Sequence, residues 1–305
     1  MSCFIFFSFF VVNIYYIYYN FNYFLIPKLS FGRFAFLFCL CYFVFEVNNF
    51  MNKVESSFSD LIQKFHLIAR KRWIKSVNKG LGSIGYTFEN ELGKAPDSLY
   101  LPDYNGVEIK CIGRYSRYPI TLFTVAFDGP TFPEINRIID LYGVADKDFN
   151  DKKVLFATLC CRRMISVSPL YKFKLDVDYE EEKIYLCVYD DNGNFIERKC
   201  FVYFKSIYDH LVLKLNKLAV VYASKKVIDG ITYFRYYKID IYRFTDFDNF
   251  LLLLNEGIIK VKLISRISKS GNDIGRYRNK NLVFMIDKCN LDRLFDRVYF
   301  YDYDK

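Results

Sequence analysis

The amino-acid sequence predicts a mixed α/β (α+β) fold for most of the 305-residue chain. Three observations support this fold class. Some segments place apolar residues at helical spacing, others are short apolar runs between turn residues, and the two kinds do not alternate strictly. The lack of a regular strand–helix alternation argues against a barrel or a doubly wound parallel sheet. Because 52% of the residues are hydrophobic and 25% are charged, the chain can form a packed core.

The first elements expected after residue 50 are a long helix, a short helix and a hairpin. Glycines at 80, 82 and 85 separate the two helices, and the short helix over 87–92 is expected to end at Gly93. Two short runs flank Asn105-Gly106, the strongest short-range signal for a β-hairpin, which we place over 98–111. The long helix is expected over 59–77, where apolar residues recur at helical spacing: Leu61, Ile62, Phe65, Ile68, Ala69 and Trp73.

The rest of the chain continues the mixture of helices and strands. A second hairpin is expected over 183–204, with its turn at residues 190–193. A change of lobe is expected around 145–180. Helices are predicted over 135–142, 207–218, 247–255 and 291–295, and strands over 153–160, 219–227, 231–242, 258–267 and 282–286.

Composition narrows the possible chemistry. The net charge of +9 favours an anionic partner, either nucleic acid or a membrane surface. The nine cysteines form no Cys-x-x-Cys pair and the chain has two histidines, which disfavours a structural zinc site and a Ser-His-Asp or Cys-His mechanism. An odd number of irregularly spaced cysteines indicates reduced thiols in a cytoplasmic protein. Catalysis is therefore expected from carboxylates, lysines and metal ions.

Residues 1–50 form a segment of different composition. Twenty of them are Phe or Tyr, and only Lys28, Arg33 and Glu46 are charged. The segment is long enough for a membrane anchor, but translation of AT-rich DNA upstream of a gene would give the same apolar, aromatic composition. We expect the second origin, with Met51 as the true start. A peptide from residues 1–50 in mass spectrometry of the native protein would contradict this expectation.

The predicted hairpin carries side chains that could catalyse a reaction. In a two-residue loop Asp103 faces Glu108, and Lys110 shares their face because strand side chains alternate. Directly opposed residues have Cβ atoms roughly 4.5–5.5 Å apart, so the two carboxylates repel one another unless a cation lies between them. Mg²⁺ prefers such oxygen ligands and can polarise a phosphate and activate water. Lys110 can orient that water or stabilise the developing charge.

The residues around this hairpin carry a resemblance to a known family. The pair PD at 102–103 followed by EIK at 108–110 resembles the PD-(D/E)xK nuclease signature. The strings GYTFE at 85–89, LG at 92–93 and ITLFT at 120–124 are similar to stretches of the MvaI/BcnI-like type II restriction endonucleases and their MutH-type relatives. The short spacing between Asp103 and Glu108 fits the MvaI/BcnI branch better than MutH.

This resemblance implies a fold, an activity and roles for residues. It implies a PD-(D/E)xK restriction-endonuclease-like core with a C-terminal DNA-recognition lobe, and Mg²⁺-dependent, site-specific cleavage of double-stranded DNA by a monomer, with a cognate methyltransferase in the same system. The catalytic lobe is expected over 51–160, and the rest of the core and the recognition lobe over 161–305. The implied catalytic residues are Asp103, Glu108, Lys110 and Glu89, and the implied metal ligands are Asp103, Glu108 and the backbone carbonyl of Ile109.

Basic residues on two segments are candidates for DNA contacts. Arg114 and Arg117 follow the catalytic strand and alternate with tyrosines, where they suit backbone phosphates. Residues 259–280 contain seven basic residues and one acidic residue, but lack the histidines of the family's recognition segment. Within this stretch, the candidates for contact with guanine in the major groove are Arg276, Arg278 and Lys280.

Three alternative interpretations stay open. A MutH-like nicking endonuclease of mismatch repair would use the same site together with a methyl-directed partner. A DNA-binding protein that has lost cleavage is disfavoured by the intact set of Asp103, Glu108 and Lys110. A membrane protein defined by residues 1–50 would require that segment to be translated and inserted.

Overall fold

The structure, a computed structural model, describes residues 56–305 except 81, 95–100, 131, 279 and 280. The elements below belong to one compact unit, Ser57–Lys305. The expectations for residues 1–50 lie outside the described residues. Among the helices of the described part, none is long and apolar enough to cross a lipid bilayer.

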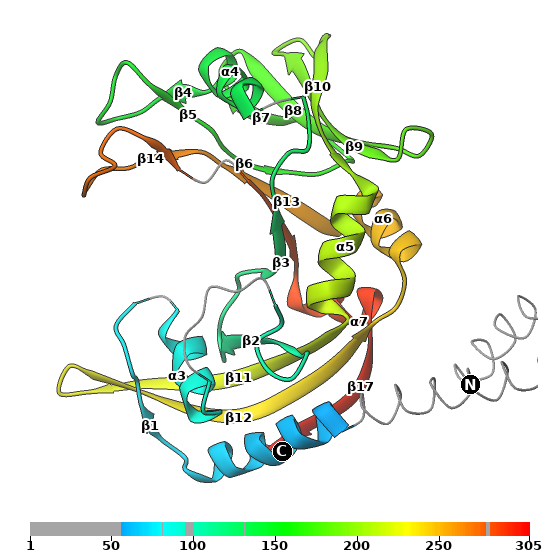
Figure 1. The fold of residues 1–305 in the computed structure, drawn as a ribbon. Helices are drawn as coiled ribbons and strands as arrows, with labels where there is room; N and C mark the ends of the chain where they lie inside the picture. The colour runs from blue at the N-terminus through cyan, green and yellow to red at the C-terminus, as the bar shows by residue number, and fades with distance from the viewer. Residues whose placement is uncertain (1–55, 81, 95–100, 131, 279–280) are drawn as a thin grey trace, which may run out of the picture. The chain divides into compact units, whose positions relative to one another are not determined.

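The first sheet contains the strand that follows the predicted turn. Its strands are, in order, β1 (Ile74–Lys75), β12 (Ile231–Phe244), β11 (Lys217–Ile228) and β2 (Glu108–Gly113), and β17 (Phe295–Asp302) also pairs with β12. β2 runs parallel to β11, whereas the other pairs are antiparallel (Figure 1). Because a parallel pair needs a long crossover, residues far from β2 in the sequence complete its sheet.

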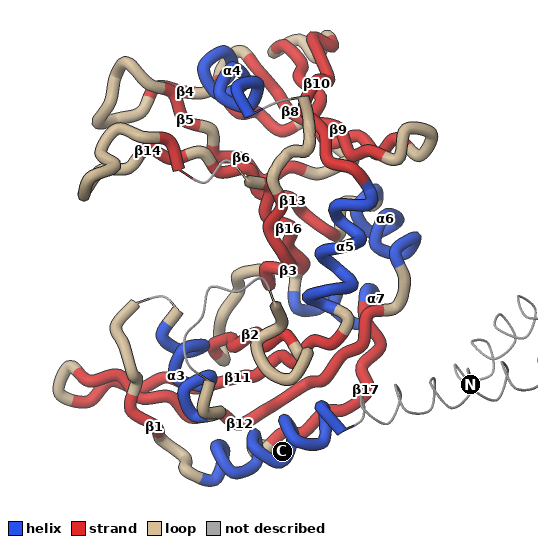
Figure 2. Tube along the Cα trace, viewed as in Figure 1, coloured by secondary structure: helices blue, strands red, loops and turns tan. Residues whose placement is uncertain are grey.

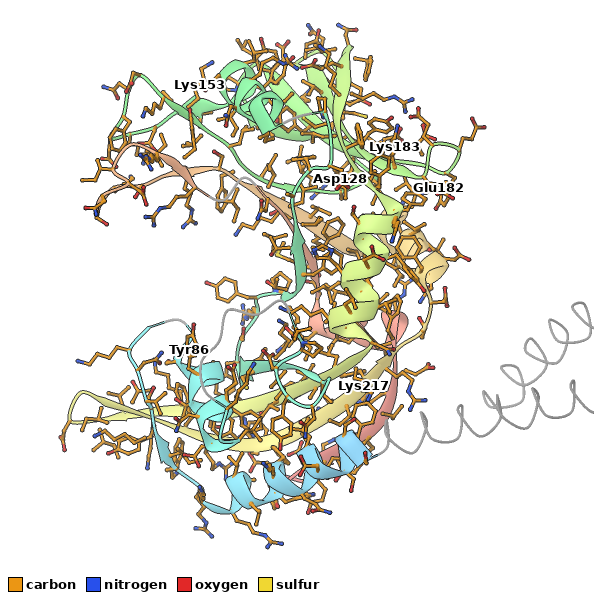
Figure 3. The ribbon with its side chains drawn as sticks, viewed as in Figure 1. Tyr86, Asp128, Lys153, Glu182, Lys183 and Lys217 are labelled. Carbon is orange, nitrogen blue, oxygen red and sulfur yellow. The ribbon has the colours of Figure 1, made fainter. Side chains whose placement is uncertain are left out.

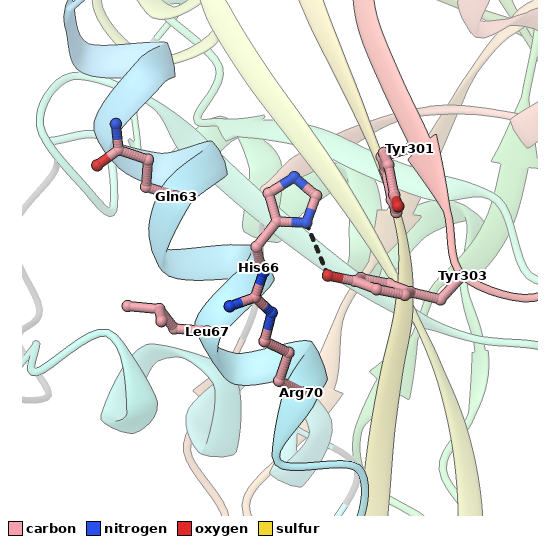
Figure 4. Close-up of a pocket in the computed structure, with 6 residues that line it drawn as sticks. All are labelled: Gln63, His66, Leu67, Arg70, Tyr301 and Tyr303. Carbon is pink, nitrogen blue, oxygen red and sulfur yellow. Dashed lines mark hydrogen bonds between the residues drawn. The ribbon is translucent and has the colours of Figure 1, made fainter.

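A helix over residues 56–70 packs against this sheet. Lys217, labelled in Figure 3, lies at the start of β11. Its Nζ donates to Ser57 Oγ at 2.9 Å and so joins the helix to the sheet. The two ring nitrogens of His66 lie 2.9 Å from Tyr303 Oη and 3.3 Å from Tyr299 Oη. Beside these contacts a surface pocket is lined by Gln63, His66, Leu67, Arg70, Tyr301 and Tyr303 (Figure 4).

A second helix, α3 (Ser83–Glu91), lies against β2 and β12. Its buried Phe88 ring is 5.0 Å from the ring of Tyr236, centroid to centroid. The hydroxyl of Tyr236 donates to the backbone oxygen of Ile84 at 2.7 Å. These contacts fix the position of α3 on the sheet, and with it the position of Glu89.

The second sheet contains β3, the strand that follows β2 in the sequence. It is antiparallel and has the order β3 (Ile120–Val125), β16 (Leu282–Ile286), β13 (Ile259–Ile264) and β6 (Phe156–Leu159). Helices α5 (Phe204–Leu215) and α6 (Phe247–Asn255) cover one of its faces (Figure 2). On that face the rings of Phe123 and Phe284 stack at 4.8 Å, and Phe250 of α6 lies 5.9 Å from Phe284.

The third sheet, antiparallel throughout, and the smaller elements complete the fold. A continuous hydrophobic core joins residues of all three sheets. The remaining helices are α4 (Phe132–Tyr142), α7 (Leu291–Leu294) and a 3-10 turn at Lys288–Asn290. The third sheet has the order β10 (Phe195–Tyr203), β9 (Lys183–Asp190), β8 (Tyr171–Asp178) and β7 (Ile165–Ser168). Two small hairpins pair β4 (Val144–Ala145) with β5 (Lys153–Val154) and β14 (Arg266–Ile267) with β15 (Tyr277–Arg278).

The predicted mixed α+β fold class is confirmed, with 25% helix and 43% strand. The hairpins predicted over 183–204 and 219–242 are present as β9–β10 and β11–β12. The second of these turns at Asp229 and Gly230, both with positive φ. The helix predicted over 247–255 and the strand predicted over 282–286 have the observed bounds of α6 and β16.

Several predicted boundaries are wrong. The helix predicted over 59–77 ends at residue 70, because Arg72 has a left-handed backbone with φ of 60° and β1 begins at Ile74. Gly85 lies inside α3 instead of interrupting it. The strand predicted over 153–160 is broken into β5 and β6. Strands β3, β7, β8 and β17 were not predicted.

Candidate active site

The turn at Asn105-Gly106 forms as predicted. Tyr104 and Val107 are bridged by two backbone hydrogen bonds of 3.0 and 2.8 Å. Asn105 and Gly106 both have positive φ, 47° and 79°, as a two-residue hairpin loop requires. The pairing does not continue into residues 101–103, so the first arm predicted for this hairpin is wrong there, and residues 95–100 lie outside the described part.

Asp103 nevertheless reaches the start of β2 through its side chain. Its Oδ2 accepts a hydrogen bond of 2.9 Å from the backbone N–H of Ile109, and its Oδ1 lies 3.5 Å from Lys94 Nζ. The predicted cross-strand pairing of Asp103 with Glu108 is thus replaced by a bond from the Asp103 carboxylate to the next residue of the strand. This bond holds the carboxylate beside Glu108.

Glu108 is the buried acid of the site. The residue is only 1% exposed, and its Oε1 accepts a hydrogen bond of 2.5 Å from Lys110 Nζ. Its Oε2 is buried and has no hydrogen-bond partner. Burial raises the pKa of the Glu108 carboxyl; the ammonium of Lys110 opposes this shift, and the neighbouring Asp103 adds to it.

An unsatisfied buried carboxylate oxygen costs folding free energy unless a ligand pairs with it. The unpartnered Oε2 of Glu108, together with the neighbouring Asp103 carboxylate, therefore fits a divalent cation. Among the described residues, no group of three His, Cys, Asp or Glu side chains is placed to hold a metal ion. A cation at this site would thus depend on two carboxylates, a backbone oxygen, water and substrate, which is the ligand set that Mg²⁺ commonly uses.

Glu89 lies on α3, the helix that packs against β2. Its side chain is half-buried. Burial raises the pKa of the Cys111 thiol on β2 well above its usual range, and the charges of Glu89 and Asp103 raise it further. Both carboxylates therefore lie within electrostatic range of the same residue of β2. The structure thus brings Glu89 to the strand that carries Glu108 and Lys110.

Lys214 is a member of the site that sequence reasoning missed. It lies in the last turn of α5, and its Nζ is 3.7 Å from Glu108 Oε1. No sequence pattern links this helix to the hairpin at 104–107, because the contact depends on the pairing of β2 with β11 directly after α5. Glu108 thus faces two ammonium groups, one from its own strand and one from α5.

We expect Lys214→Ala to move the acid limb of the pH–rate profile to higher pH. The ammonium lowers the pKa of Glu108, so its removal lets the carboxyl take up a proton at higher pH. The shift should be smaller than the one that loss of Lys110 would cause, since Lys214 lies farther from Glu108 Oε1, at 3.7 Å against 2.5 Å. Lys214→Arg should keep the wild-type profile. An unchanged acid limb in Lys214→Ala would remove Lys214 from the site.

The candidate phosphate-contacting residues Arg114 and Arg117 differ in their contacts within the protein. Arg114 forms an ion pair of 2.6 Å with Asp304 and lies over the ring of Tyr237 at 4.8 Å, so it is engaged within the protein. Arg117 is exposed. It lies between the two most exposed large hydrophobic side chains of the described part, Tyr115 and Tyr118, at 87% and 83%.

The candidates for base contact lie on and beside the small hairpin β14–β15. Arg276 and Arg278 are exposed, and both lie near Asp273, at 3.1 and 3.9 Å. Lys280 lies outside the described residues. The loop of this hairpin also contacts the loop between β4 and β5, where Lys152 Nζ donates to the Gly275 backbone oxygen at 2.5 Å.

A mixed α+β fold in which Asp103 lies beside Glu108 and Lys110 of one strand is typical of nucleases of the restriction-endonuclease type. The model of the MvaI/BcnI restriction endonuclease family matches residues 62–295, and the chain belongs to this family. The resemblance found in the hairpin region is therefore confirmed. Membership makes the chain a type II site-specific deoxyribonuclease, a class of enzymes that generally needs divalent metal ions.

Solved structures agree with this assignment. The chain is similar to the restriction endonuclease MvaI in complex with its cognate DNA substrate, with a TM-score of 0.70, 25% identity, and coverage of 80% of this chain and 96% of MvaI. It shares its fold with MvaI in the absence of DNA, with a TM-score of 0.51, 22% identity, and coverage of 79% and 96%. Among curated proteins, none matches the chain significantly.

Proposed function

We propose that this protein is a Mg²⁺-dependent restriction enzyme that hydrolyses phosphodiester bonds of double-stranded DNA at a specific sequence. The observation that carries the proposal is the buried Glu108, whose Oε2 has no hydrogen-bond partner, whose Oε1 is bonded to Lys110 and whose carboxyl has Asp103 as a neighbour, in a chain of this family. The similar MvaI structure contains cognate DNA, which supports double-stranded DNA as the substrate.

Asp103, Glu108 and the backbone carbonyl of Ile109 would hold the Mg²⁺ ion. When bound, Mg²⁺ supplies a positive charge that polarises the scissile phosphate and favours ionisation of the attacking water. The residues fit this role because Asp103 is fixed by the Ile109 N–H group and Glu108 keeps one oxygen unpaired. The positive charge also relieves the repulsion between the two carboxylates.

The side chains of the protein orient the reacting groups. Lys110 has three N–H donors, of which one bonds to Glu108. The others can hold the attacking water and stabilise the charge that develops on the phosphate. Glu89, from α3, supports Lys110 or the water. The burial of Glu108 strengthens each of these electrostatic interactions, since bulk water is excluded from its carboxylate.

The proposed DNA contacts divide between the two regions of candidates. Exposed Arg117 contacts backbone phosphates near the active site, where the contact fixes register without reading sequence. Arg276 and Arg278 contact DNA from the β14–β15 hairpin, where a side chain at the tip can reach a base edge. We further propose that the protein acts as a monomer in the cytoplasm, and that a cognate methyltransferase protects the host DNA.

Digestion of unmethylated phage DNA and of a supercoiled plasmid tests this function. With Mg²⁺ the full chain should give discrete fragments and linear plasmid, and with EDTA it should give neither. Nicked circles as the only product would favour a MutH-like nicking endonuclease. A folded protein that binds DNA but leaves several DNAs uncut in Mg²⁺ would contradict the proposed activity.

A further inference from the structure

One face of the second sheet is left uncovered by α5 and α6. Alternate residues of β13 point to opposite faces; Ile259, Val261 and Leu263 are buried, while Lys260, Lys262 and Ile264 are half-buried on the other face. The face with the buried residues is the one that the helices cover, since Phe284, which is paired with Val261, contacts Phe250 of α6. The other face therefore carries the lysines.

A basic cluster surrounds an exposed aromatic ring on this lysine-bearing face. Phe156 is 58% exposed and pairs with Ile264. Lys262 Nζ lies 4.6 Å and the Arg266 guanidinium 5.9 Å from the centre of its ring. Arg266 lies directly opposite Arg278 in the β14–β15 pair. We call Phe156, Lys262, Arg266 and Arg278 the Phe156 cluster.

The charges of the Phe156 cluster are not balanced within the protein. Like charges directly opposite one another in a strand pair are destabilising. In the described part of the chain, Lys262 and Arg266 form no ion pair, and the carboxylate near Arg278 is that of Asp273, 3.9 Å away. Phe156 has most of its ring in water. An anion with an apolar surface beside it would offset the repulsion between the cations and would cover the exposed Phe156 ring.

The position of the cluster connects it with the proposed active site and the hairpin of the proposed base contacts. β3 follows β2 after a short connection and belongs to the same sheet as β13, and β14 follows β13 directly (Figure 1). The uncovered face thus lies on the sheet that joins the strand of Glu108 to the hairpin of Arg276. A duplex that reaches both regions would provide the missing anion as a row of phosphates.

We propose that the Phe156 cluster binds the sugar–phosphate backbone of duplex DNA; this inference rests on the proposed function. Lys262 and Arg266 contact phosphates, and Phe156 packs against the adjacent deoxyribose while its ring holds both cations in place through cation–π contacts. Arg278 adds a third charge from the neighbouring strand. Such contacts set affinity and register for every sequence alike, whereas recognition of bases is left to Arg276, in the loop directly before β15.

The salt dependence of DNA binding tests the cluster. Dissociation constants for cognate and unrelated duplexes would be measured by fluorescence anisotropy in EDTA from low to moderate salt. Each of Lys262→Ala and Arg266→Ala should reduce the slope of log K against log salt by about 0.9, the value for one lost phosphate contact. The affinity ratio between cognate and unrelated DNA should stay unchanged, whereas Arg276→Ala should lower that ratio.

Matched controls separate this effect from unfolding and from a general loss of positive charge. Arg266→Lys should keep the wild-type slope. Lys205→Ala on α5 and Arg293→Ala on α7 remove exposed charges elsewhere and should also keep it, and circular dichroism would verify that each variant is folded. Wild-type slopes in Lys262→Ala and Arg266→Ala, in a protein that still cleaves DNA, would overturn the cluster proposal alone. A wild-type protein that neither binds nor cleaves DNA would overturn both proposals.

Discussion

Lys110→Ala is expected to lower the single-turnover rate constant of DNA cleavage by about 10²–10³-fold, the usual cost of losing one charge-stabilising donor at a reacting centre. Lys110 is bonded to Glu108 at 2.5 Å and is the catalytic lysine of the proposed site. In the proposed mechanism, its removal takes away the group that holds the attacking water and offsets the phosphate charge. The measurement is quench-flow cleavage of a short duplex that contains the mapped site.

DNA affinity separates a catalytic from a binding role for Lys110. In EDTA the Lys110→Ala variant should bind the same duplex within a few-fold of the wild type. Lys205→Ala, which removes an exposed lysine on α5, should cleave at the wild-type rate. A Lys110→Ala protein that keeps more than a tenth of the wild-type rate constant would contradict the assigned role.

Glu108→Gln is expected to abolish cleavage and at the same time to raise stability in the absence of metal. The substitution removes a buried charge whose Oε2 has no partner. Addition of Mg²⁺ or Ca²⁺ should stabilise the wild type by about 2.7 kcal/mol when the metal is at 100 times its Kd. This corresponds to a rise in Tm of roughly 5–10 °C for a domain of this size, and the variant should show almost none of it. Differential scanning fluorimetry measures both effects.

The stability gain of Glu108→Gln should depend on pH. Because burial raises the folded-state pKa of Glu108, the protonated carboxyl favours the folded state. That contribution is fully present below the unfolded-state pKa of about 4.3 and is lost as pH rises through the folded-state pKa. The free energy of unfolding of the variant, relative to that of the wild type, should therefore increase from acid to neutral pH. Glu180→Gln, at an exposed position, is the control, and a variant less stable than the wild type in EDTA at neutral pH would contradict the account.

Local signals explain the parts of the site that the sequence could predict. The pair Asn105-Gly106 favours the positive φ that both residues adopt, so the turn and the closeness of Asp103 and Glu108 follow from a few residues. The turn at Asp229-Gly230 predicts the pair β11–β12 in the same way. Strand β8 also alternates apolar and polar residues, and this pattern could have identified it.

Contacts between distant segments explain the rest. Lys214 reaches Glu108 only because β11 pairs with β2 in parallel, and no local pattern specifies that pairing. Arg114 is engaged by Asp304 near the end of the chain, which its position after the catalytic strand does not reveal. Trp73 continues the helical spacing of its segment, yet it lies beyond the helix with Lys226 over its ring at 4.3 Å, so a tertiary contact replaces the predicted helical one.

Sequencing of the DNA ends left after complete digestion tests the central claim most directly. The full chain and its Lys110→Ala variant would be incubated with a phage genome in Mg²⁺, and the ends of all fragments would be read. The account predicts that the wild-type ends share one short sequence at a fixed cut position, and that the variant leaves the genome intact. Ends without a common sequence, or identical cleavage by the variant, would contradict a site-specific endonuclease with its active site at Asp103, Glu108 and Lys110.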